Sequence, residues 1–463
     1  MSVRHFGSPR FLWLALIGLA VLLRLGVMLA RPERLTEDRD LYLGIANEIR
    51  AGHGYATPGS DPPRPTAFRP PLYPILLALT GGSRAGIGTL HLLLAAVMVV
   101  ATGLAAERLA GQWGNVHRAT RFIAGGIVAI DPMLLLYSGQ PMTETLCSGL
   151  TAVLLWGLAS RLVAQDEMGF QREGEAPAEP LLPEGVDLGS GSAGASSSRA
   201  IVAGLMWGLC LLGRPTYAAG LGLWLAGSVF LGWRERVSVR PRLRCGLVVG
   251  VVALAVVAPW AIRNWSVFGQ PIVTTTHGGY TLWLANNPVY YSEVIEGPDA
   301  VWSGESLNRW QTETSAEMDR LQIQGEVARD EWQSARAKQF MLANPWRFVR
   351  ACLYRGVTFW SIWPGRSVDP RVPVPMLWVI AGWYAALWVG GVVATLRVIR
   401  GGQWRLLLPA FSLILGFAAV HWVYWTDARM RAPVMPAVAV LVAVGMGQRG
   451  GCTAASRSAA DRS

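Results

Sequence analysis

The stretch FLWLALIGLAVLLRLGVMLARPERLTEDRDLYLGIANEIR, residues 11–50, holds the two features on which the fold prediction depends. Its first half, residues 11–30, is an apolar run of the length that a bilayer core requires, about 20 residues. An acidic cluster, Glu37, Asp38 and Asp40, follows where this run ends. The stretch therefore predicts a membrane helix that leads directly into a loop rich in carboxylates.

A secretory signal peptide is the alternative interpretation of residues 11–30. The run is longer than the apolar region of a signal peptide, and no clear Ala-x-Ala cleavage site follows it. We therefore expect a retained first membrane helix.

The rest of the chain is equally apolar. Of its 463 residues 52% are hydrophobic and only 15% are charged, whereas about a quarter of the residues of a soluble domain are charged. The sequence thus predicts an all-α integral membrane protein, a multi-pass helical bundle of about ten spans with interfacial helices. The further spans are expected at 88–108, 121–139, 143–163, 200–214, 216–233, 244–263, 375–397, 404–422 and 431–447. Because 200–214 and 216–233 are short, Arg214-Pro215 between them is either a tight turn or a break within one element.

Arginine supplies nearly all of the net charge of +11, which allows two interpretations. A basic chain can bind nucleic acid, but here the arginines cluster in short loops between apolar runs, as the positive-inside rule predicts for a membrane protein. Residues 234–244 hold five Arg and one Glu, and 397–405 hold three Arg and no acid. Placing both loops in the cytoplasm puts residues 31–70 and 264–373 outside and both termini inside. We expect the membrane to be the inner membrane.

Residues 347–363 conflict with this orientation if they form a span, so we interpret them as an interfacial helix. Five scattered cysteines show no disulfide or metal spacing.

The predicted organisation is a membrane module, an outer subdomain with helical character over 305–345, the last membrane helices and a disordered tail. Their bounds are 1–264, 265–373, 374–448 and 449–463, and the first module contains an outer loop at 31–87 and a disordered cytoplasmic insert at 165–199.

The first outer loop combines acidic and basic groups. Tyr42, Ile45 and Ile49 fall on one helix face, and Asp38 lies one turn before Tyr42. A carboxylate there either complements the helix dipole or takes part in chemistry. The Pro-rich string PTAFRPPLYP then holds an extended chain that presents Arg69 at the membrane face. A carboxylate and a guanidinium on one loop suit a substrate that is both nucleophilic and anionic.

This loop, EDRDLYLGIANEIRAGHGY followed by PTAFRPPLYPILLAL, resembles the first outer loop of GT-C glycosyltransferases that use lipid-phosphate sugars. These include protein O-mannosyltransferases and the aminoarabinose transferases of lipid A. Four later stretches are similar to that family in the same order. They are IDPMLLLYSGQPMTETL (130–146), GLCLLGRPTY (208–217), PWAIRNWSVFGQPIVTTTHGGYTLWLANNP (259–288) and HWVYWTDARMRAPVMPAVAVL (421–441).

The resemblance implies roles for particular residues. In the family an Asp four residues before an aromatic is the catalytic carboxylate, which implies Asp38 before Tyr42; the acidic pair of the family is absent, which leaves Asp40 as an alternative. Glu144 is expected as a supporting acid. The expected phosphate-binding residues are Arg69, Arg214, Arg263, Arg429 and Arg431, and the expected lining of the substrate cavity is Tyr42, Tyr73, His277 and Asn286.

The chemistry agrees with these roles. A polyprenyl phosphate sugar carries its own leaving group, so the reaction needs a base for the acceptor hydroxyl and cations for the departing phosphate. The expectation is an inner-membrane enzyme that transfers a hexosyl or pentosyl group, with inversion, from a polyprenyl phosphate to a lipid, glycan or protein. No cofactor is expected, and dependence on a divalent metal is left open because the outer acids show no ligand spacing.

Two alternatives remain at the level of the sequence. A transporter or a flippase for lipid-linked sugars would carry ionisable residues in its spans, and here these are few, namely Arg24 and Asp131. No repeat relates the two halves of the chain, as inverted repeats do in many transporters. The third interpretation is a non-catalytic scaffold of the envelope.

Overall fold

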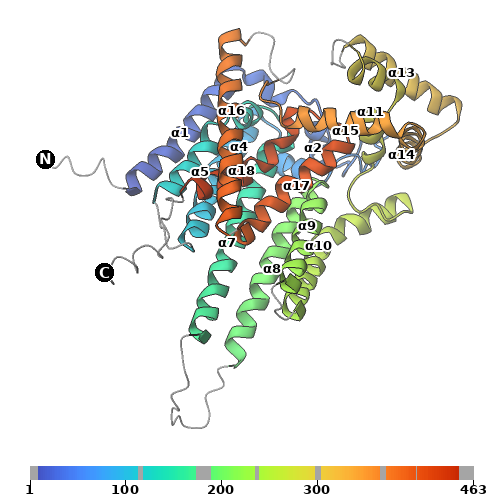
Figure 1. Ribbon diagram of the computed structural model, residues 1–463. Coiled ribbons are helices and arrows are strands. Elements are labelled where there is room, and N and C mark those ends of the chain that lie inside the picture. Colours follow the sequence, from blue (N-terminus) through green and yellow to red (C-terminus); the bar gives the residue numbers. More distant parts are fainter. Residues whose placement is uncertain are drawn as a thin grey trace, which may run out of the picture.

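The computed structural model describes residues 9–112, 118–173, 189–234, 239–297, 304–364, 372–402 and 404–447, and within them the fold is built from helices (Figure 1). An isolated bridge pairs Ala56 with Pro65. The principal helices are α1 (Pro9–Ala30), α2 (Tyr42–Arg50), α3 (Leu72–Leu79), α4 (Arg84–Gly111), α5 (Arg118–Ile130), α6 (Pro132–Ser138), α7 (Thr143–Glu173), α8 (Gly189–Gly213), α9 (Tyr217–Arg234), α10 (Val239–Phe268), α11 (Gly278–Ala285), α13 (Glu305–Arg320), α14 (Glu326–Ala343), α15 (Pro345–Phe359), α16 (Val374–Arg400), α17 (Leu408–Val423) and α18 (Met435–Met446).

The chain is a multi-pass membrane protein. Six helical segments within the described residues are long and apolar enough to cross a bilayer, and the bent pair α5–α6 makes a seventh if it counts as one span. Shorter apolar helices cover Thr143–Ala159 and Ser198–Gly213. All ten predicted positions are helical, but the number of ten crossings stays a prediction.

Small residues bring several of the helices into close contact. A Cβ atom at Gly204 or Gly208 of α8 would lie 2.5 Å from Val252 or Val256 of α10. Gly416 of α17 similarly touches the backbone of Gly220 in α9. Helices in lipid gain no hydrophobic driving force from meeting each other, so such small-residue contacts supply the packing. These contacts hold α8 and α9 in the bundle, with residues 214–216 as the tight turn between them.

The span over α5 and α6 is broken at Asp131-Pro132, where the two helices meet at 52°. Arg24 of α1 is fully buried and donates hydrogen bonds to the carbonyls of Val128 and Ala129, 2.9 and 3.0 Å away, at the end of α5. Asp131 accepts hydrogen bonds from the amides of Met133 and Leu134 at the start of α6. Backbone groups freed inside a membrane need such partners. The two ionisable residues noted within the predicted spans therefore serve the break in a helix.

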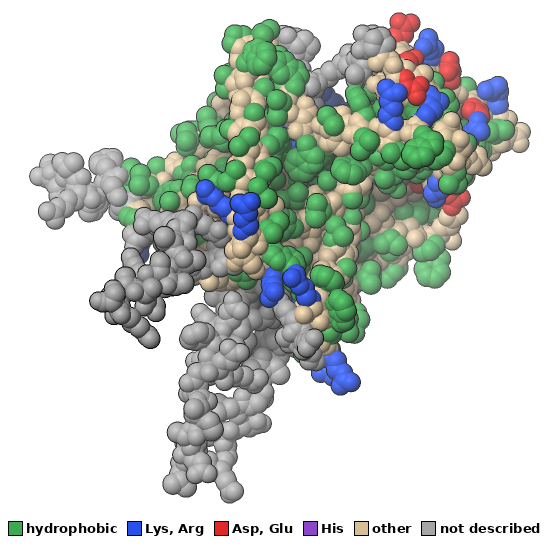
Figure 2. All heavy atoms as spheres, in the orientation of Figure 1, with side chains coloured by type: hydrophobic (Ala, Val, Ile, Leu, Met, Phe, Trp, Pro, Cys, Tyr) green, Lys and Arg blue, Asp and Glu red, His purple; other side chains and the backbone are tan. Residues whose placement is uncertain are grey.

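A separate group of helices, α11 and α13–α15, packs beside the end of the bundle that carries residues 31–83 (Figure 1). On the face shown in Figure 2, the visible Asp and Glu side chains gather over this group. Helix α14 ends at Ala343 and α15 begins at Pro345, as the sequence predicts. The exposed face of α15 carries Trp346, Leu353 and Val357, which is the pattern of an interfacial helix.

One expectation differs from the structure. Residues 165–173 continue α7 and residues 189–199 open α8, so helix replaces the expected disorder at both ends of the insert. Each residue added to an existing helix gains a backbone hydrogen bond, which favours such extension. Residues 174–188 in the middle of the insert, and the tail 449–463, lie outside the described residues.

Replacing Arg24 by Met should destabilise the folded protein, because the carbonyls of Val128 and Ala129 would lose their partner inside the membrane. The expected loss is about 1–3 kcal/mol per unpaired buried group. Thermal unfolding in detergent measures it, with Arg10→Met at the start of the same helix as a control of similar chemistry. Equal melting temperatures for the two variants would contradict this role.

Candidate active site

The site begins at the turn that precedes α2. Leu41 has a positive φ of 63°, which turns the chain sharply before the helix. The carboxylate of Asp38 accepts hydrogen bonds from the amides of Leu43 and Gly44, at 3.1 and 2.6 Å. These amides have no partner within a helix at its first turn, so Asp38 caps α2. The sequence allows two roles for Asp38, an interaction with the helix N-terminus or a part in chemistry. The structure shows the interaction with the N-terminus of α2.

The Pro-rich loop before α3 places Arg69. Arg263 of α10 donates hydrogen bonds to the carbonyls of Thr66 and Tyr55, at 2.7 and 2.8 Å. The hydroxyl of Tyr55 donates to the carbonyl of Arg69 at 2.8 Å, and the hydroxyl of Thr275 donates to that of Phe68. These hydrogen bonds hold the backbone of the loop. The guanidinium of Arg69, which lies near α2, therefore has a defined position.

Asp40 is the carboxylate that meets arginines. Its Oδ1 lies 3.3 Å from Nη2 of Arg69, and its Oδ2 lies 3.2 Å from Nη1 of Arg429, a residue 389 positions later in the chain. Arg69 also donates to the carbonyl of Asp40 at 2.7 Å, and its guanidinium lies 5.1 Å from the centre of the Tyr42 ring. Arg429 also contacts a second carboxylate, because its Nε lies 3.3 Å from Oδ2 of Asp427.

The charges around Asp40 keep it ionised. Burial alone would raise the pKa of Asp40, but the nearby charges of Arg429 and Arg69 outweigh burial and hold that pKa below its usual value. Burial raises the pKa of Tyr42, which keeps its phenol neutral at physiological pH. The resting cluster thus contains one carboxylate shared between two permanent cations.

A second pair lies beside this cluster, at the start of α7. Glu144 is buried, and its Oε1 lies 3.8 Å from Nη1 of Arg214. Arg214 donates its other Nη to the sulfur of Met430, next to Arg429 in the chain. Neither Oε2 of Glu144 nor Nη1 of Arg214 has a hydrogen-bond partner among the described residues. Buried polar atoms are nearly always hydrogen-bonded, so this pair is suited to a polar ligand.

His277 lies on the other side of Asp40, at the start of α11. Its ring packs 4.3 Å from the centre of Phe68, next to Arg69, and its Nδ1 is buried without a hydrogen-bond partner among the described residues. Burial and the charge of Arg69 lower the pKa of His277 well below its usual value, so the imidazole is neutral. No three His, Cys, Asp or Glu side chains of the described chain come together as a metal site would require.

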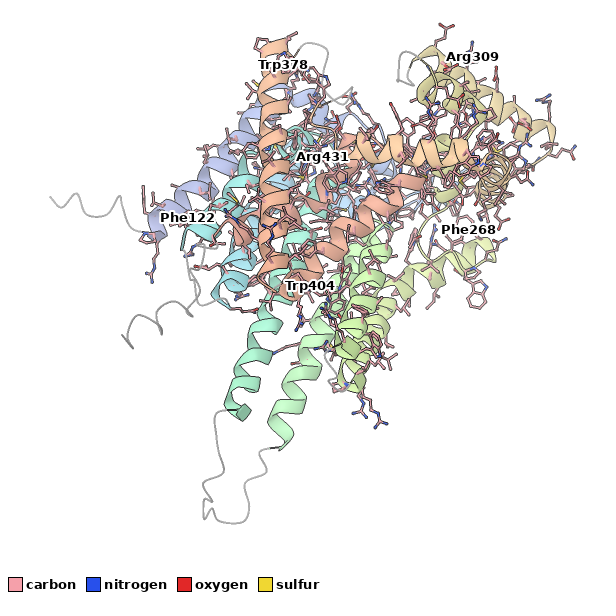
Figure 3. All side chains as sticks on the ribbon, viewed as in Figure 1. Phe122, Phe268, Arg309, Trp378, Trp404 and Arg431 are labelled. Carbon is pink, nitrogen blue, oxygen red and sulfur yellow. The ribbon has the colours of Figure 1, made fainter. Side chains whose placement is uncertain are left out.

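Four of the expected site residues make other contacts, although the Tyr73 ring lies only 5.3 Å from that of Tyr42. Arg263 binds the loop carbonyls already described. Arg431 (labelled in Figure 3) is fully buried, and its Nη1 donates to the carbonyls of Phe359 and Ser361, whereas its Nε and Nη2 have no hydrogen-bond partner among the described residues. The phenol of Tyr73 pairs with His91 at 2.8 Å, and the side-chain amide of Asn286 donates to the carbonyl of Val423. All four side chains bind backbone groups or other core residues. Of the two arginines in the turn before α18, Arg429 and Arg431, only Arg429 contacts Asp40.

Glu326 is a positioning residue that the sequence did not reveal. Its carboxylate, on α14, accepts hydrogen bonds from the hydroxyl of Thr66 at 2.7 Å, the amide of Ala67 at 2.6 Å and the hydroxyl of Thr276 at 3.1 Å. One side chain thus fixes the loop before Arg69 and the residue before His277. Its sequence context, a Glu in the first turn of a polar helix, is that of a surface residue.

Similarity to solved structures shows that the chain has the GT-C fold. No protein-family model matches the chain, and no curated protein matches it in sequence. Among solved structures, the chain is similar to the oligosaccharyltransferase AglB of Archaeoglobus fulgidus in complex with an inhibitory peptide and a dolichol-phosphate. The match has a TM-score of 0.50 at 14% identity and covers 94% of this chain and 50% of AglB.

The apo form of the Archaeoglobus fulgidus oligosaccharyltransferase gives a TM-score of 0.50 at 13% identity, over 95% of this chain and 50% of that one. ArnT from Cupriavidus metallidurans bound to undecaprenyl phosphate matches at 14% identity over 94% of this chain and 77% of its own, with a TM-score of 0.39. This chain therefore spans about half the length of the oligosaccharyltransferase.

Because His277 is neutral in the fold and its pKa is depressed, its contribution to stability is complete above the unfolded pKa of about 6.5 and is lost as the pH falls below that value. We expect the melting temperature of the wild type to fall between pH 6.5 and pH 5, and to fall less in His277→Gln. Unfolding scans in detergent at each pH measure both, with His53→Gln on the exposed part of the loop as the control. A pH dependence that is unchanged in His277→Gln would contradict the assignment.

Proposed function

We propose that this protein transfers a glycosyl group from a polyprenyl phosphate to an acceptor on the extracytoplasmic side of the inner membrane, with inversion. The observation that carries the proposal is the position of Asp40 between Arg69 and Arg429, at one end of the membrane bundle. The GT-C fold supports glycosyl transfer in general, and the dolichol-phosphate of the AglB complex supports a lipid phosphate as the carrier.

The arginines suit the leaving group. A phosphate leaves without a general acid if cations stabilise its charge, and guanidinium groups bind its oxygens through two parallel hydrogen bonds. Arg429 and Arg69 face Asp40, and Arg214 lies near Glu144 with an unpaired Nη1. Together they provide a cationic environment for one phosphate group. The sugar would then lie toward Glu144, whose unpaired Oε2 can accept a hydrogen bond from a hydroxyl or an amine.

Asp40 is our candidate for the base. In the resting state both of its oxygens contact guanidinium groups, which makes it a weak base. A donor phosphate that binds Arg69 and Arg429 would weaken these contacts and raise the basicity of Asp40 at the moment when the acceptor hydroxyl must lose its proton. Asp38, which the family resemblance implies, already uses both oxygens for the amides of α2.

The orientation and the acceptor belong to the same proposal. The arginine-rich start of α10 and end of α16 lie at the end of the bundle away from α2 (Figure 1), which supports a cytoplasmic position for them and an outer position for the site. Labelling by an impermeant reagent of a cysteine placed at exposed Glu313, but not at exposed Arg400, would support this orientation. The acceptor would be a lipid, a glycan or a protein, and the sugar a hexose or a pentose.

The transporter or flippase alternative receives no support from the ionisable groups of the spans. Arg24 and Asp131 bind backbone groups at the broken helix, so they do not mark a path for a substrate. A scaffold without activity would not need two buried polar atoms, Oε2 of Glu144 and Nη1 of Arg214, that have no hydrogen-bond partner among the described residues. Both alternatives predict that a change of Asp40 leaves the function of the protein intact.

The decisive variants are Asp40→Asn and Asp38→Asn. We expect Asp40→Asn to lower the rate of glycosyl transfer about 10²–10⁴-fold, the usual cost of losing a general base, without loss of folded protein. Asp38→Asn should leave the rate near that of the wild type, because its remaining side-chain oxygen can still cap α2 and Asn caps helices about as well as Asp. The measurement is turnover with membrane lipid extracts as the source of donor and acceptor. A near-normal rate for Asp40→Asn with an inactive Asp38→Asn would return the role of base to Asp38.

A further inference from the structure

A second feature lies at the opposite end of the bundle from Asp40. An apolar groove of about 1240 Å³ runs between α9, α10 and the start of α17. Trp224 and Trp233 of α9 line one wall, and Leu247 and Leu254 of α10 line the other. Helix α17 meets the groove at Leu408, whereas its other end leads toward the turn that carries Arg429.

The length of the groove corresponds to one leaflet of a bilayer. Its lining on α10 runs from Pro241 to Leu254, which at 1.5 Å per residue is about 20 Å. One leaflet contributes about 15 Å of hydrocarbon, half of the whole core. On α9 the lining ends at Trp224. Two turns of helix separate Trp224 from Tyr217 at the start of α9, which is close to Arg214 in the chain. The groove therefore stops short of the Asp40 cluster.

The membrane-surface end of the groove is cationic. Arg242 and Arg405 belong to its lining, and no Asp or Glu is among the lining residues that the structure describes. Arg242 is half-buried and donates to the carbonyl of Ser228 at 3.4 Å, which holds its side chain at the wall. The adjoining segment 234–244 adds further arginines. Basic side chains at the end of an apolar groove between membrane helices attract anionic lipid head groups.

We propose that this groove is a binding site for an anionic glycerophospholipid, with its phosphate against Arg242 and Arg405 and its acyl chains between α9 and α10. A phospholipid fits the one-leaflet length and the charge at one end, whereas a polyprenyl carrier with its phosphate at Asp40 would enter from the opposite leaflet. The site is separate from the glycosyl-transfer proposal.

The first test uses native mass spectrometry of the purified protein with phosphatidylglycerol or phosphatidylcholine of identical acyl chains. We expect phosphatidylglycerol to be retained preferentially, and the double variant Arg242→Gln/Arg405→Gln to bind it about tenfold more weakly. The matched control is Arg397→Gln/Arg400→Gln, two arginines at the same end of the bundle outside the groove. Equal retention of the two lipids, or equal losses in both double variants, would overturn the proposal.

The second test locates the lipid. Cys245 lines the groove and Cys352 of α15 does not, and neither thiol is fully buried. Phosphatidylglycerol should slow maleimide labelling of Cys245 but not of Cys352, as read by peptide mapping. A Cβ at Gly250 meets no atom within 4 Å, so Gly250→Trp can fill the groove, and it should abolish the protection. Protection of Cys245 by undecaprenyl phosphate and not by phosphatidylglycerol would assign the groove to the polyprenyl carrier and overturn the proposal.

Discussion

The contacts of Asp40 with Arg69 and Arg429 join the first loop of the chain to the turn before its last helix. The carboxylate offers two oxygens, and each is directed at a different guanidinium. This arrangement depends on Arg263, which holds the loop carbonyls, on Glu326, which fixes the same loop from α14, and on Asp427, which orients Arg429. Helices α10 and α14 are thus connected to the charged cluster through the backbone of its loops.

The membrane explains why the charges lie where they do. Within the hydrocarbon every backbone group needs a partner, and a break in a helix exposes several at once. Arg24 and Asp131 satisfy the two sides of the break between α5 and α6, and Gly204 and Gly208 allow α8 to approach α10. These constraints leave the ends of the helices as the places where ionisable groups can meet a polar ligand. Burial beside several arginines makes Asp40 an ionised but weak base, which a phosphate ligand would activate.

The all-helical membrane fold could be predicted from the sequence because apolar runs of bilayer length report directly on their environment. The helical character of residues 305–345, which form α13 and α14, was predictable for local reasons as well. The different contacts of Asp38 and Asp40 were not predictable, because they depend on the turn that leads into α2 and on Arg429, 389 residues later in the chain. Arg263 and Arg431 resemble phosphate ligands in the sequence, yet both donate hydrogen bonds to distant backbone carbonyls. Glu326 gave no signal, since its partners are 50 or more residues away.

The central claim, that Arg69 and Arg429 form a phosphate site which Asp40 occupies at rest, is tested most directly by binding of undecaprenyl phosphate to the protein in nanodiscs. The account predicts that Arg69→Gln/Arg429→Gln weakens binding strongly, that lysine at both positions restores it only in part because an ammonium lacks the bidentate fork, and that Asp40→Asn strengthens it by removing the competing carboxylate. The control is Arg309→Gln/Arg336→Gln, two exposed arginines of α13 and α14 that do not contact the cluster. Undiminished binding by the Arg69 and Arg429 variant, or weaker binding by Asp40→Asn, would contradict the account.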